Sequence, residues 1–506
     1  MVSNIFASAI CALAVVEAFD MKPFYTPDTP YPQTMNDNYN LLKFVGNRGP
    51  YSDRRGVGLN RDAPDNCQVD QVVMLARHGE RWPSTGDFKD LSASVEKVKS
   101  VEHPHGPLAF VDEWEMIASS DSGWLEEETF VGPYSGLLDA YYHGVQYRRR
   151  YGHLYDGQSS LPLFISAYQR DADTGRKFGE GFLAWNYTDL AAVNFVLENN
   201  GANSLSPSCE LKENISTTLC PDFTYYKEFD EAAQRLNKLY PGMNLNSSDV
   251  YNLLDLVSYE LNVRGSSPWV SVFTSQEWVA YEYYVDALYY CTAGPGSVTG
   301  PIIGSLFLNG TRNLLVKGPE ESNLPLAFSF AHDTDILKLA ATMGLDAPEN
   351  VTTFDPTQLR FNSSYHVVEI VPQGARFVFE RLTCRSDANE PDYYNEFPDA
   401  FNSSTYINGT SNSTNTYVRI VVNEAVVPIN ECATGPGASC PIDDFSNWVD
   451  THLEGRDFVE NCVIPDSDPT EFTVFTNYSL SNEFNADSPY EPFRGRTLNS
   501  TGQPVK

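Results

Sequence analysis

Residues 72–83 read Val72-Val73-Met74-Leu75-Ala76-Arg77-His78-Gly79-Glu80-Arg81-Trp82-Pro83, an apolar run that ends abruptly in Arg-His-Gly-x-Arg-x-Pro. The apolar part predicts a buried strand, which would fix the position of whatever follows it. We expect Gly79 to allow a sharp turn and the final proline to stiffen the exit, so that Arg77, His78 and Arg81 converge at the strand's end. Three basic side chains at one point predict a site for an oxyanion, most simply a phosphate.

The full seven-residue pattern is much rarer than a lone Arg-His pair, which commonly belongs to a salt-bridged surface. It resembles the signature of the histidine acid phosphatases, the secreted branch of the histidine phosphatase superfamily, which also contains fungal and yeast phytases. The segments 371–376, 417–421 and 435–440 resemble yeast members in particular. The resemblance implies an α/β fold like that of phosphoglycerate mutase: a mostly parallel sheet flanked by helices, with an inserted smaller α-helical domain.

A third arginine, Arg170, follows a strand-like segment at 161–167 and precedes a helical pattern at 174–185. Helix N-termini favour anions, which would reinforce a phosphate site. The family pattern has an arginine before a Thr/Ser-Ala/Gly step and a Phe-x-x-Gly, and Arg170 is in register with it. The alternative is that Arg170 pairs with Asp171 or Asp173 on the surface.

The stretch Phe328-Ser329-Phe330-Ala331-His332-Asp333-Thr334-Asp335 ends another strand-like run, at 326–330. A His-Asp pair alone most often caps a helix. The resemblance implies that His332 hydrogen-bonds the transferring phosphoryl group and that Asp333 protonates the leaving oxygen and then activates water. Asp335 is the rival acid, and the family pattern favours Asp333.

Phosphomonoester cleavage needs a nucleophile, a positive clamp and an acid for the leaving alkoxide. We expect His78 to attack phosphorus and form a phosphohistidine, with Arg77, Arg81 and Arg170 binding the phosphoryl oxygens. Nearby guanidiniums disfavour the imidazolium, so His78 could stay neutral below its usual pKa of about 6.5, which predicts an acidic optimum. Because arginines supply the countercharge, we expect no metal and no cofactor.

The chain carries 34 Lys and Arg against 67 Asp and Glu, a formal net charge of -33. This charge argues against binding to nucleic acid or to an anionic membrane surface. Residues 5–16 form an apolar segment too short to span a bilayer, so residues 1–18 are predicted to be a signal peptide. We expect no membrane anchor, because the C-terminal segment lacks an apolar tail. We expect a secreted glycoprotein of the cell wall, periplasmic space or medium. Its candidate glycosylation sites are Asn186, Asn214, Asn246, Asn309, Asn350, Asn362, Asn402, Asn408, Asn412, Asn477 and Asn499.

Eight cysteines remain after the predicted signal, an even set that suits disulfides in a secreted enzyme. They lack paired Cys-x-x-Cys units, which argues against a zinc site. Spacing alone leaves 105 pairings open. Resemblance to the fungal enzymes implies three of the bonds, leaving Cys220 with Cys291 as the fourth. The implied set is Cys67–Cys384, Cys209–Cys462, Cys220–Cys291 and Cys432–Cys440.

Strand and helix patterns alternate along the chain, which predicts helices covering a mainly parallel sheet. Further strands are expected at 365–370, 375–383 and 417–427 and a polar loop at 401–416. The predicted parts are a Pro-rich extended arm at 19–66, a catalytic domain at 67–85, 131–205 and 301–506, and a helical cap at 86–130 and 206–300. The arm could also hold a homo-oligomer together.

The leading hypothesis is a secreted acid phosphatase acting on phosphomonoesters, with phytate as a possible substrate. The alternatives are a cytosolic-type phosphohistidine mutase, a non-catalytic wall glycoprotein and a metal-dependent hydrolase, for which the further His and Asp ligands are not evident. A phytase would need basic groups on the pocket rim; candidates are Lys89, Arg176, Lys177 and Arg264. His103 and His105 are expected in a loop rather than in a metal site.

Overall fold

The computed structural model describes residues 40–64, 66–220, 226–345, 359, 364–385 and 414–481. The predicted signal peptide and most of the loop at 401–416 lie outside these residues. So do six of the predicted glycosylation sites: Asn350, Asn362, Asn402, Asn408, Asn412 and Asn499.

An eight-stranded sheet forms the centre, in the order β3-β2-β4-β1-β5-β6-β7, with β8 paired to β6. The strands β3, β2, β4 and β1 run parallel, and β5 to β8 add an antiparallel side. The expected α/β fold is confirmed, as are the strands predicted at 69–76, 161–167 and 326–330. The strand bounds are β1 (Cys67–Arg77), β2 (Leu161–Ser166), β3 (Ala191–Val196), β4 (Leu326–Ala331), β5 (Arg376–Arg385), β6 (Thr414–Val422), β7 (Ala425–Val427) and β8 (Cys440–Pro441).

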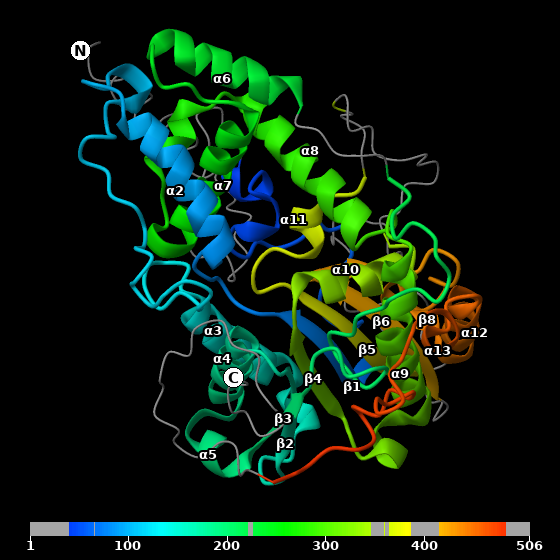
Figure 1. The fold of residues 1–506 in the computed structure, drawn as a ribbon. Helices are drawn as coiled ribbons and strands as arrows, with labels where there is room; N and C mark the ends of the chain where they lie inside the picture. Colours follow the sequence, from blue (N-terminus) through cyan, green and yellow to red (C-terminus); the bar gives the residue numbers. More distant parts are fainter. Residues whose placement is uncertain are drawn as a thin grey trace, which may run out of the picture.

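Helices cover both faces of the sheet (Figure 1). Successive side chains of a strand point to opposite faces, so Val72 and Met74 of β1 pack with one set of helices and Val73 and Leu75 with the other. The first set is α3 (Gly136–Tyr151) and α4 (Gln169–Leu183), and the second is α9 (Thr299–Ser322), α10 (Asp333–Thr342) and α12 (Ile442–Leu453). Such double coverage explains why β1, β2 and β4 read as nearly continuous apolar runs.

A second group of helices lies beyond one end of the sheet, at the top of Figure 1. Its members are α2 (Thr85–Lys99), α6 (Lys227–Leu239), α7 (Ser247–Arg264) and α8 (Ser275–Thr292). Capping boxes begin three of them, with Ser84, Asn246 and Thr274 accepting hydrogen bonds from the third helical N–H. The shorter helices elsewhere are α5 (Tyr187–Leu190), α11 (Val367–Ile370) and α13 (Phe458–Asn461).

The prediction of a strand at 365–370 is wrong, because most of this segment forms the single-turn helix α11. The carboxylate of Asp286 on α8 accepts the Val367 N–H at 2.7 Å, so the first amide of the turn bonds across to another helix instead of to a neighbouring strand. The strand predicted at 417–427 is two strands, β6 and β7. Asn423 and Glu424, both at positive φ, form the tight turn between them.

The described residues form four disulfides, three of which join parts that are far apart in the sequence: Cys67–Cys384, Cys209–Cys462, Cys220–Cys291 and the short-range Cys432–Cys440. These are the pairs that the resemblance and the remaining two cysteines implied. The first links β1 to β5 at directly opposed positions of the ladder. Cross-links over 317 and 253 residues restrict the unfolded chain strongly and so stabilise the folded state.

A buried ion pair joins β5 to β6, where Glu380 and Arg419 face each other with 1% of each side chain exposed. Glu380 also accepts from Arg61 at 2.8 Å and from the Tyr151 hydroxyl at 2.6 Å. Burial opposes the carboxylate, yet Arg419 and Arg61 outweigh it and lower the pKa of Glu380 to about 2. The cluster therefore keeps its charges at the acidic pH that the sequence predicts for activity.

We expect Glu380→Gln to lower the free energy of unfolding by ~3 kcal/mol at pH 7, because it leaves the buried Arg419 without its countercharge and leaves Arg61 with Glu424 as its carboxylate partner. Since the folded pKa of Glu380 lies below the unfolded value, this stabilisation is complete above about pH 4.5 and is lost as the pH falls towards about 2. Urea unfolding at pH 7 and pH 3 measures the difference. Glu321→Gln, at an exposed carboxylate paired loosely with Lys317, is the control. An equal loss at both pH values would contradict the assignment.

Candidate active site

The basic residues of the opening motif lie where β1 ends, at the carboxyl edge of the parallel strands. His78 directly follows β1; its N–H donates to the Ala331 carbonyl of β4 at 3.1 Å and its carbonyl accepts from Gly374 N–H at 2.8 Å. Parallel pairing of β1 with β4 brings the chain after Arg77 next to the chain after Ala331. Two motifs separated by about 250 residues of sequence thus meet at one edge of the sheet.

Gly79 is required because its surroundings leave no space for a side chain. It does not have positive φ, but a Cβ at this position would lie 2.8 Å from the Gly136 carbonyl oxygen. The reverse contact is tighter, since a Cβ on Gly136 would lie 2.2 Å from the Glu80 carbonyl oxygen. The start of α3 therefore packs directly on the backbone of the loop that follows His78.

The His78 ring is buried and its hydrogen can be assigned. Nδ1 lies 2.8 Å from the Gly79 carbonyl oxygen, which can only accept, so Nδ1 carries the hydrogen and Nε2 keeps a free lone pair. Burial, followed by Arg170, Arg77 and Arg81, holds the pKa of His78 well below its usual value of 6.5. The ring therefore stays neutral below its usual pKa, which is the charge state that the sequence predicts for it.

The structure places Arg77, Arg81 and Arg170 close enough to lower the pKa of His78 together. Arg77 is buried and donates through Nη1 to the Val371 carbonyl at 2.7 Å and to the Asn47 carbonyl. Arg81 donates to the Trp82 carbonyl at 2.9 Å. Arg170 is the second residue of α4, so the positive end of that helix adds to the three guanidiniums.

Each of these arginines has a carboxylate neighbour. Arg77 Nη2 lies 2.9 Å from Asp333 Oδ2, Arg81 Nη2 lies 3.8 Å from Asp87 Oδ2, and Arg170 Nη1 lies 3.8 Å from Glu126 Oε2. Arg170 also stacks on the Tyr168 ring at 4.3 Å. A surface pair between Arg170 and Asp171 or Asp173, the alternative from sequence, is not among the ion pairs of the described residues.

Asp333 is the first residue of α10. Its Oδ2 accepts from Asn47 Nδ2 at 2.7 Å besides facing Arg77, and its Oδ1 accepts from Thr334 N–H at 2.8 Å. Burial opposes the charge, but Arg77, His332 and Arg81 lower the pKa of Asp333 to about 2. The carboxyl group is thus ionised before substrate arrives, and the negative charge of a phosphoryl group beside it would have to raise its pKa before it could act as an acid.

The rival acid Asp335 faces away from this cluster. Its Oδ2 accepts from the Ser206 hydroxyl at 2.6 Å and from the His332 N–H at 3.2 Å, closing a capping box at the start of α10. Lys338 lies 3.3 Å from its other oxygen. Asp335 therefore stabilises the helix, while Asp333 holds the position beside Arg77.

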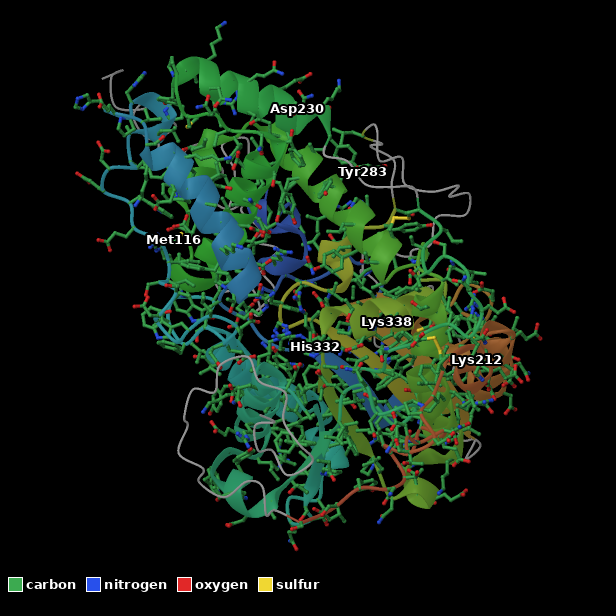
Figure 2. All side chains as sticks on the ribbon, in the orientation of Figure 1. Met116, Lys212, Asp230, Tyr283, His332 and Lys338 are labelled. Atoms are coloured by element: carbon green, nitrogen blue, oxygen red, sulfur yellow. A yellow bond between two sulfur atoms is a disulfide. The ribbon has the colours of Figure 1, made fainter. Side chains whose placement is uncertain are left out.

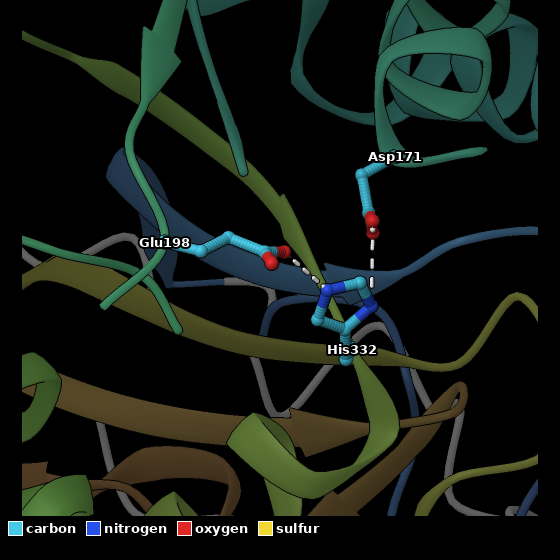
Figure 3. A group of neighbouring side chains, drawn as sticks. All are labelled: Asp171, Glu198 and His332. Atoms are coloured by element: carbon cyan, nitrogen blue, oxygen red, sulfur yellow. Dashed lines mark hydrogen bonds and ion pairs between the residues drawn. The ribbon is translucent and has the colours of Figure 1, made fainter. Parts of the chain in front are cut away.

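His332 lies near the middle of the molecule, with its ring centroid 6.0 Å from that of His78 (Figure 2). A carboxylate faces each of its ring nitrogens (Figure 3): Glu198 Oε1 lies 2.5 Å from Nε2, and Asp171 Oδ2 lies 3.3 Å from Nδ1. Burial alone would lower the pKa of His332, but Asp171 and Glu198 outweigh it and raise the pKa. The ring is an imidazolium at acidic pH, opposite in charge state to His78.

Two residues that contact this site, Asn47 and Glu198, are not predicted by any motif in the sequence. Asn47 comes from the segment predicted as an extended arm, where residues 41–48 instead form two short 3-10 helices with Leu41, Leu42 and Val45 in the core. Glu198 follows β3 and could have been sought there, because it ends a parallel strand at the same edge as His78 and His332.

Hydrogen bonds to Glu128 and Thr174 also hold the loop after His78. The Gly79 N–H donates to Glu128 Oε1 at 2.7 Å and to the Thr174 hydroxyl at 2.9 Å. Thr174 lies on α4, so this contact ties the loop after His78 to the helix that bears Arg170. Glu80 accepts the Tyr51 N–H at 2.7 Å, and burial raises its pKa to about 7.

Two groups of side chains place possible metal ligands within 4.8 Å of one another: Asp171, Glu198 and His332; and Glu282, Asp286 and His366. In the first group the carboxylates face opposite nitrogens of one ring, an arrangement that suits an imidazolium with two hydrogens better than one ion. In the second, both carboxylates face His366 Nδ1, at 2.6 and 3.0 Å. Their hydrogen bonds raise the pKa of His366 to about 11, which again describes an ion pair.

Comparisons with known proteins agree with this geometry. The family model described as "Histidine phosphatase superfamily (branch 2)" matches residues 68–423. The chain is 36% identical to an acid phosphatase (PHO1) of Komagataella pastoris, over 88% of this chain and 92% of that protein, and 36% identical to a phytase (PHO112) of Candida albicans, over 89% and 93%. It resembles the solved phytase of D. castellii with a TM-score of 0.76 and 32% identity, covering 91% of this chain and 95% of that one.

Proposed function

The chain belongs to branch 2 of the histidine phosphatase superfamily, and we propose that its carboxyl-edge site hydrolyses phosphomonoesters at acidic pH through a phosphohistidine on His78. The observation that carries the proposal is the His78 ring: its hydrogen is on Nδ1, its Nε2 lone pair is free, and three arginines surround it. A neutral imidazole among cations can attack a phosphoryl group whose oxygens those cations bind.

The proposed reaction has two steps. When the substrate binds, its negative charge raises the pKa of Asp333, and the carboxylate takes up a proton. His78 Nε2 attacks phosphorus while the bond to the ester oxygen breaks, and Asp333 gives that proton to the departing alkoxide. Water then attacks the phosphohistidine, Asp333 takes a proton from it, and the bond between nitrogen and phosphorus breaks to release phosphate. In this scheme Arg77, Arg81 and Arg170 bind the phosphoryl oxygens and His332 donates to one of them.

Three further parts of the function are proposals of the same kind. The helices α2 and α6 to α8 belong to the predicted cap at 86–130 and 206–300. They would cover the site and limit which substrates can enter it. Secretion is supported by the signal-like N-terminus and the four disulfides. No helix in the described part of the chain combines the length and apolar character that crossing a bilayer needs. Association through the arm at 19–66 stays a prediction.

We also propose phytate as a substrate. The proposal is supported by the Candida albicans and D. castellii relatives, both of which are named as phytases. Two of the basic residues considered for a phytate-binding rim already have carboxylate neighbours: Lys177 lies 2.7 Å from Glu180, and Arg264 pairs with Glu260.

Purified protein is expected to hydrolyse 4-nitrophenyl phosphate at pH 4 to 5, with undiminished activity after dialysis against EDTA because arginines supply the countercharge. Release of phosphate from phytate under the same conditions, compared as kcat/KM with the aryl ester, measures the substrate preference. A loss of activity with EDTA that added Zn²⁺ or Mg²⁺ restores would contradict the metal-independent mechanism.

A further inference from the structure

Glu198 occupies a position on His332 that the substrate needs. Nδ1 of His332 is enclosed by protein and faces Asp171, which is fully buried. This leaves Nε2 as the ring nitrogen that an incoming phosphoryl oxygen can reach. Nε2 lies 2.5 Å from Glu198 Oε1 (Figure 3), and a carboxylate oxygen is an acceptor of the same kind as a phosphoryl oxygen.

The anchoring of Glu198 differs from that of the other carboxylates in the site. Asp333 is fixed by the Thr334 N–H and by Asn47, and Asp87 by the capping box of α2. Glu198 lies outside regular structure, after β3, with 15% of its side chain exposed. Apart from His332, its hydrogen-bond partner among the described residues is the Ser166 hydroxyl, which donates to Oε1 at 3.0 Å.

We propose that Glu198 is a built-in competitor of the phosphoryl group: its carboxylate takes the place of a phosphoryl oxygen on His332 Nε2, weakens anion binding by its charge, and gives up Nε2 when substrate enters. The inference rests on the proposed function, because it concerns the same pocket. Two anions cannot share one imidazolium N–H without a Coulomb cost, so either Glu198 moves aside or it takes up a proton.

The charged groups that face Glu198 determine how this competition depends on pH. They are His332, Arg170 and Asp171, with Asp335 behind the ring. Burial opposes the carboxylate, but His332, Ser166 and Arg170 outweigh it and lower the pKa of Glu198 below its usual 4.5. Glu198 therefore competes as a carboxylate at pH 6, and the competition fades only after the pH has fallen below the usual carboxyl value of 4.5.

Calorimetric titration with inorganic phosphate tests the proposal in Glu198→Gln, which keeps an acceptor for Ser166 but removes the charge. At pH 6 we expect phosphate to bind about fivefold tighter than in wild type. The KM for 4-nitrophenyl phosphate should fall by a similar factor, and both differences should shrink as the pH falls further and further below 4.5. Ser166→Ala, which loosens Glu198 without removing its charge, should tighten binding less.

Glu180→Gln is the matched control, because it makes the same charge change on α4 at a carboxylate paired with Lys177, outside the site. Its phosphate affinity should equal that of wild type. Unchanged or weaker phosphate binding in a natively folded Glu198→Gln would overturn the proposal and make Glu198 a support of the His332 charge instead. Phosphate binding needs no turnover, so tighter binding without any hydrolysis of phosphomonoesters in the wild type would refute the proposed function alone.

Discussion

Replacing His78 by alanine should lower kcat for 4-nitrophenyl phosphate by at least about 10⁴-fold at pH 4 to 5, the size of effect seen when a covalent nucleophile is removed. The free Nε2 lone pair is the group that we expect to attack phosphorus. The carboxylate of Asp333 is held by Arg77, Asn47 and the Thr334 N–H and does not occupy the position of that lone pair. The three arginines remain, so inorganic phosphate should still bind. Steady-state kinetics and calorimetry measure the two quantities separately.

His105→Ala is the control for this variant, because His105 is exposed and its ring packs on Tyr240 at 5.0 Å, away from the sheet edge. It should keep wild-type turnover. Thermal unfolding of both variants shows whether the fold is intact. If folded His78→Ala retained more than about one tenth of wild-type kcat, another group would have to be the nucleophile.

The second large effect is expected for Asp333→Asn, and it should depend on the leaving group. Asparagine keeps one acceptor oxygen, which can serve either Thr334 or Asn47, but its amide has no acidic proton to give to an alkoxide. We expect kcat/KM for an alkyl phosphate to fall by about 10²- to 10⁴-fold, and that for 4-nitrophenyl phosphate, whose leaving group needs little protonation, to fall far less. Because kcat/KM reports the steps up to phosphoryl transfer, it isolates the role of the acid.

Asp335→Asn makes the same change two residues along the helix, where the carboxylate caps α10 and accepts from Ser206. It should lower stability and should not distinguish good from poor leaving groups. Equal losses for both substrate classes in Asp333→Asn would remove Asp333 from the role of proton donor and leave it as a partner that orients Arg77.

The sequence predicts those parts of the molecule that depend on local pattern. Apolar runs that end in charged motifs located β1 and β4 and placed His78 and Asp333 at one edge, because parallel strands align their carboxyl ends. Arg170 could be predicted for the same reason, since it follows β2.

The contacts that a linear pattern cannot reveal were missed. Asn47 contacts Asp333 across 286 residues of sequence, and Glu198 contacts His332 across 134 residues. No sequence motif predicts either contact. The mistaken strand at 365–370 has the same origin, since its apolar alternation fits a strand until Asp286 on α8 binds the Val367 N–H. Local propensity yields where a distant side chain satisfies the backbone.

The most direct test is an alkaline quench during turnover of a phosphomonoester labelled in its phosphoryl group, followed by mapping of the labelled residue. Our account predicts a base-stable, acid-labile label on His78, attached through Nε2 because Nδ1 holds the hydrogen bonded to the Gly79 carbonyl. Label on any other residue would contradict the proposed mechanism. So would turnover by Asp333→Asn without a trapped phosphoenzyme, because this variant should hydrolyse the phosphohistidine slowly.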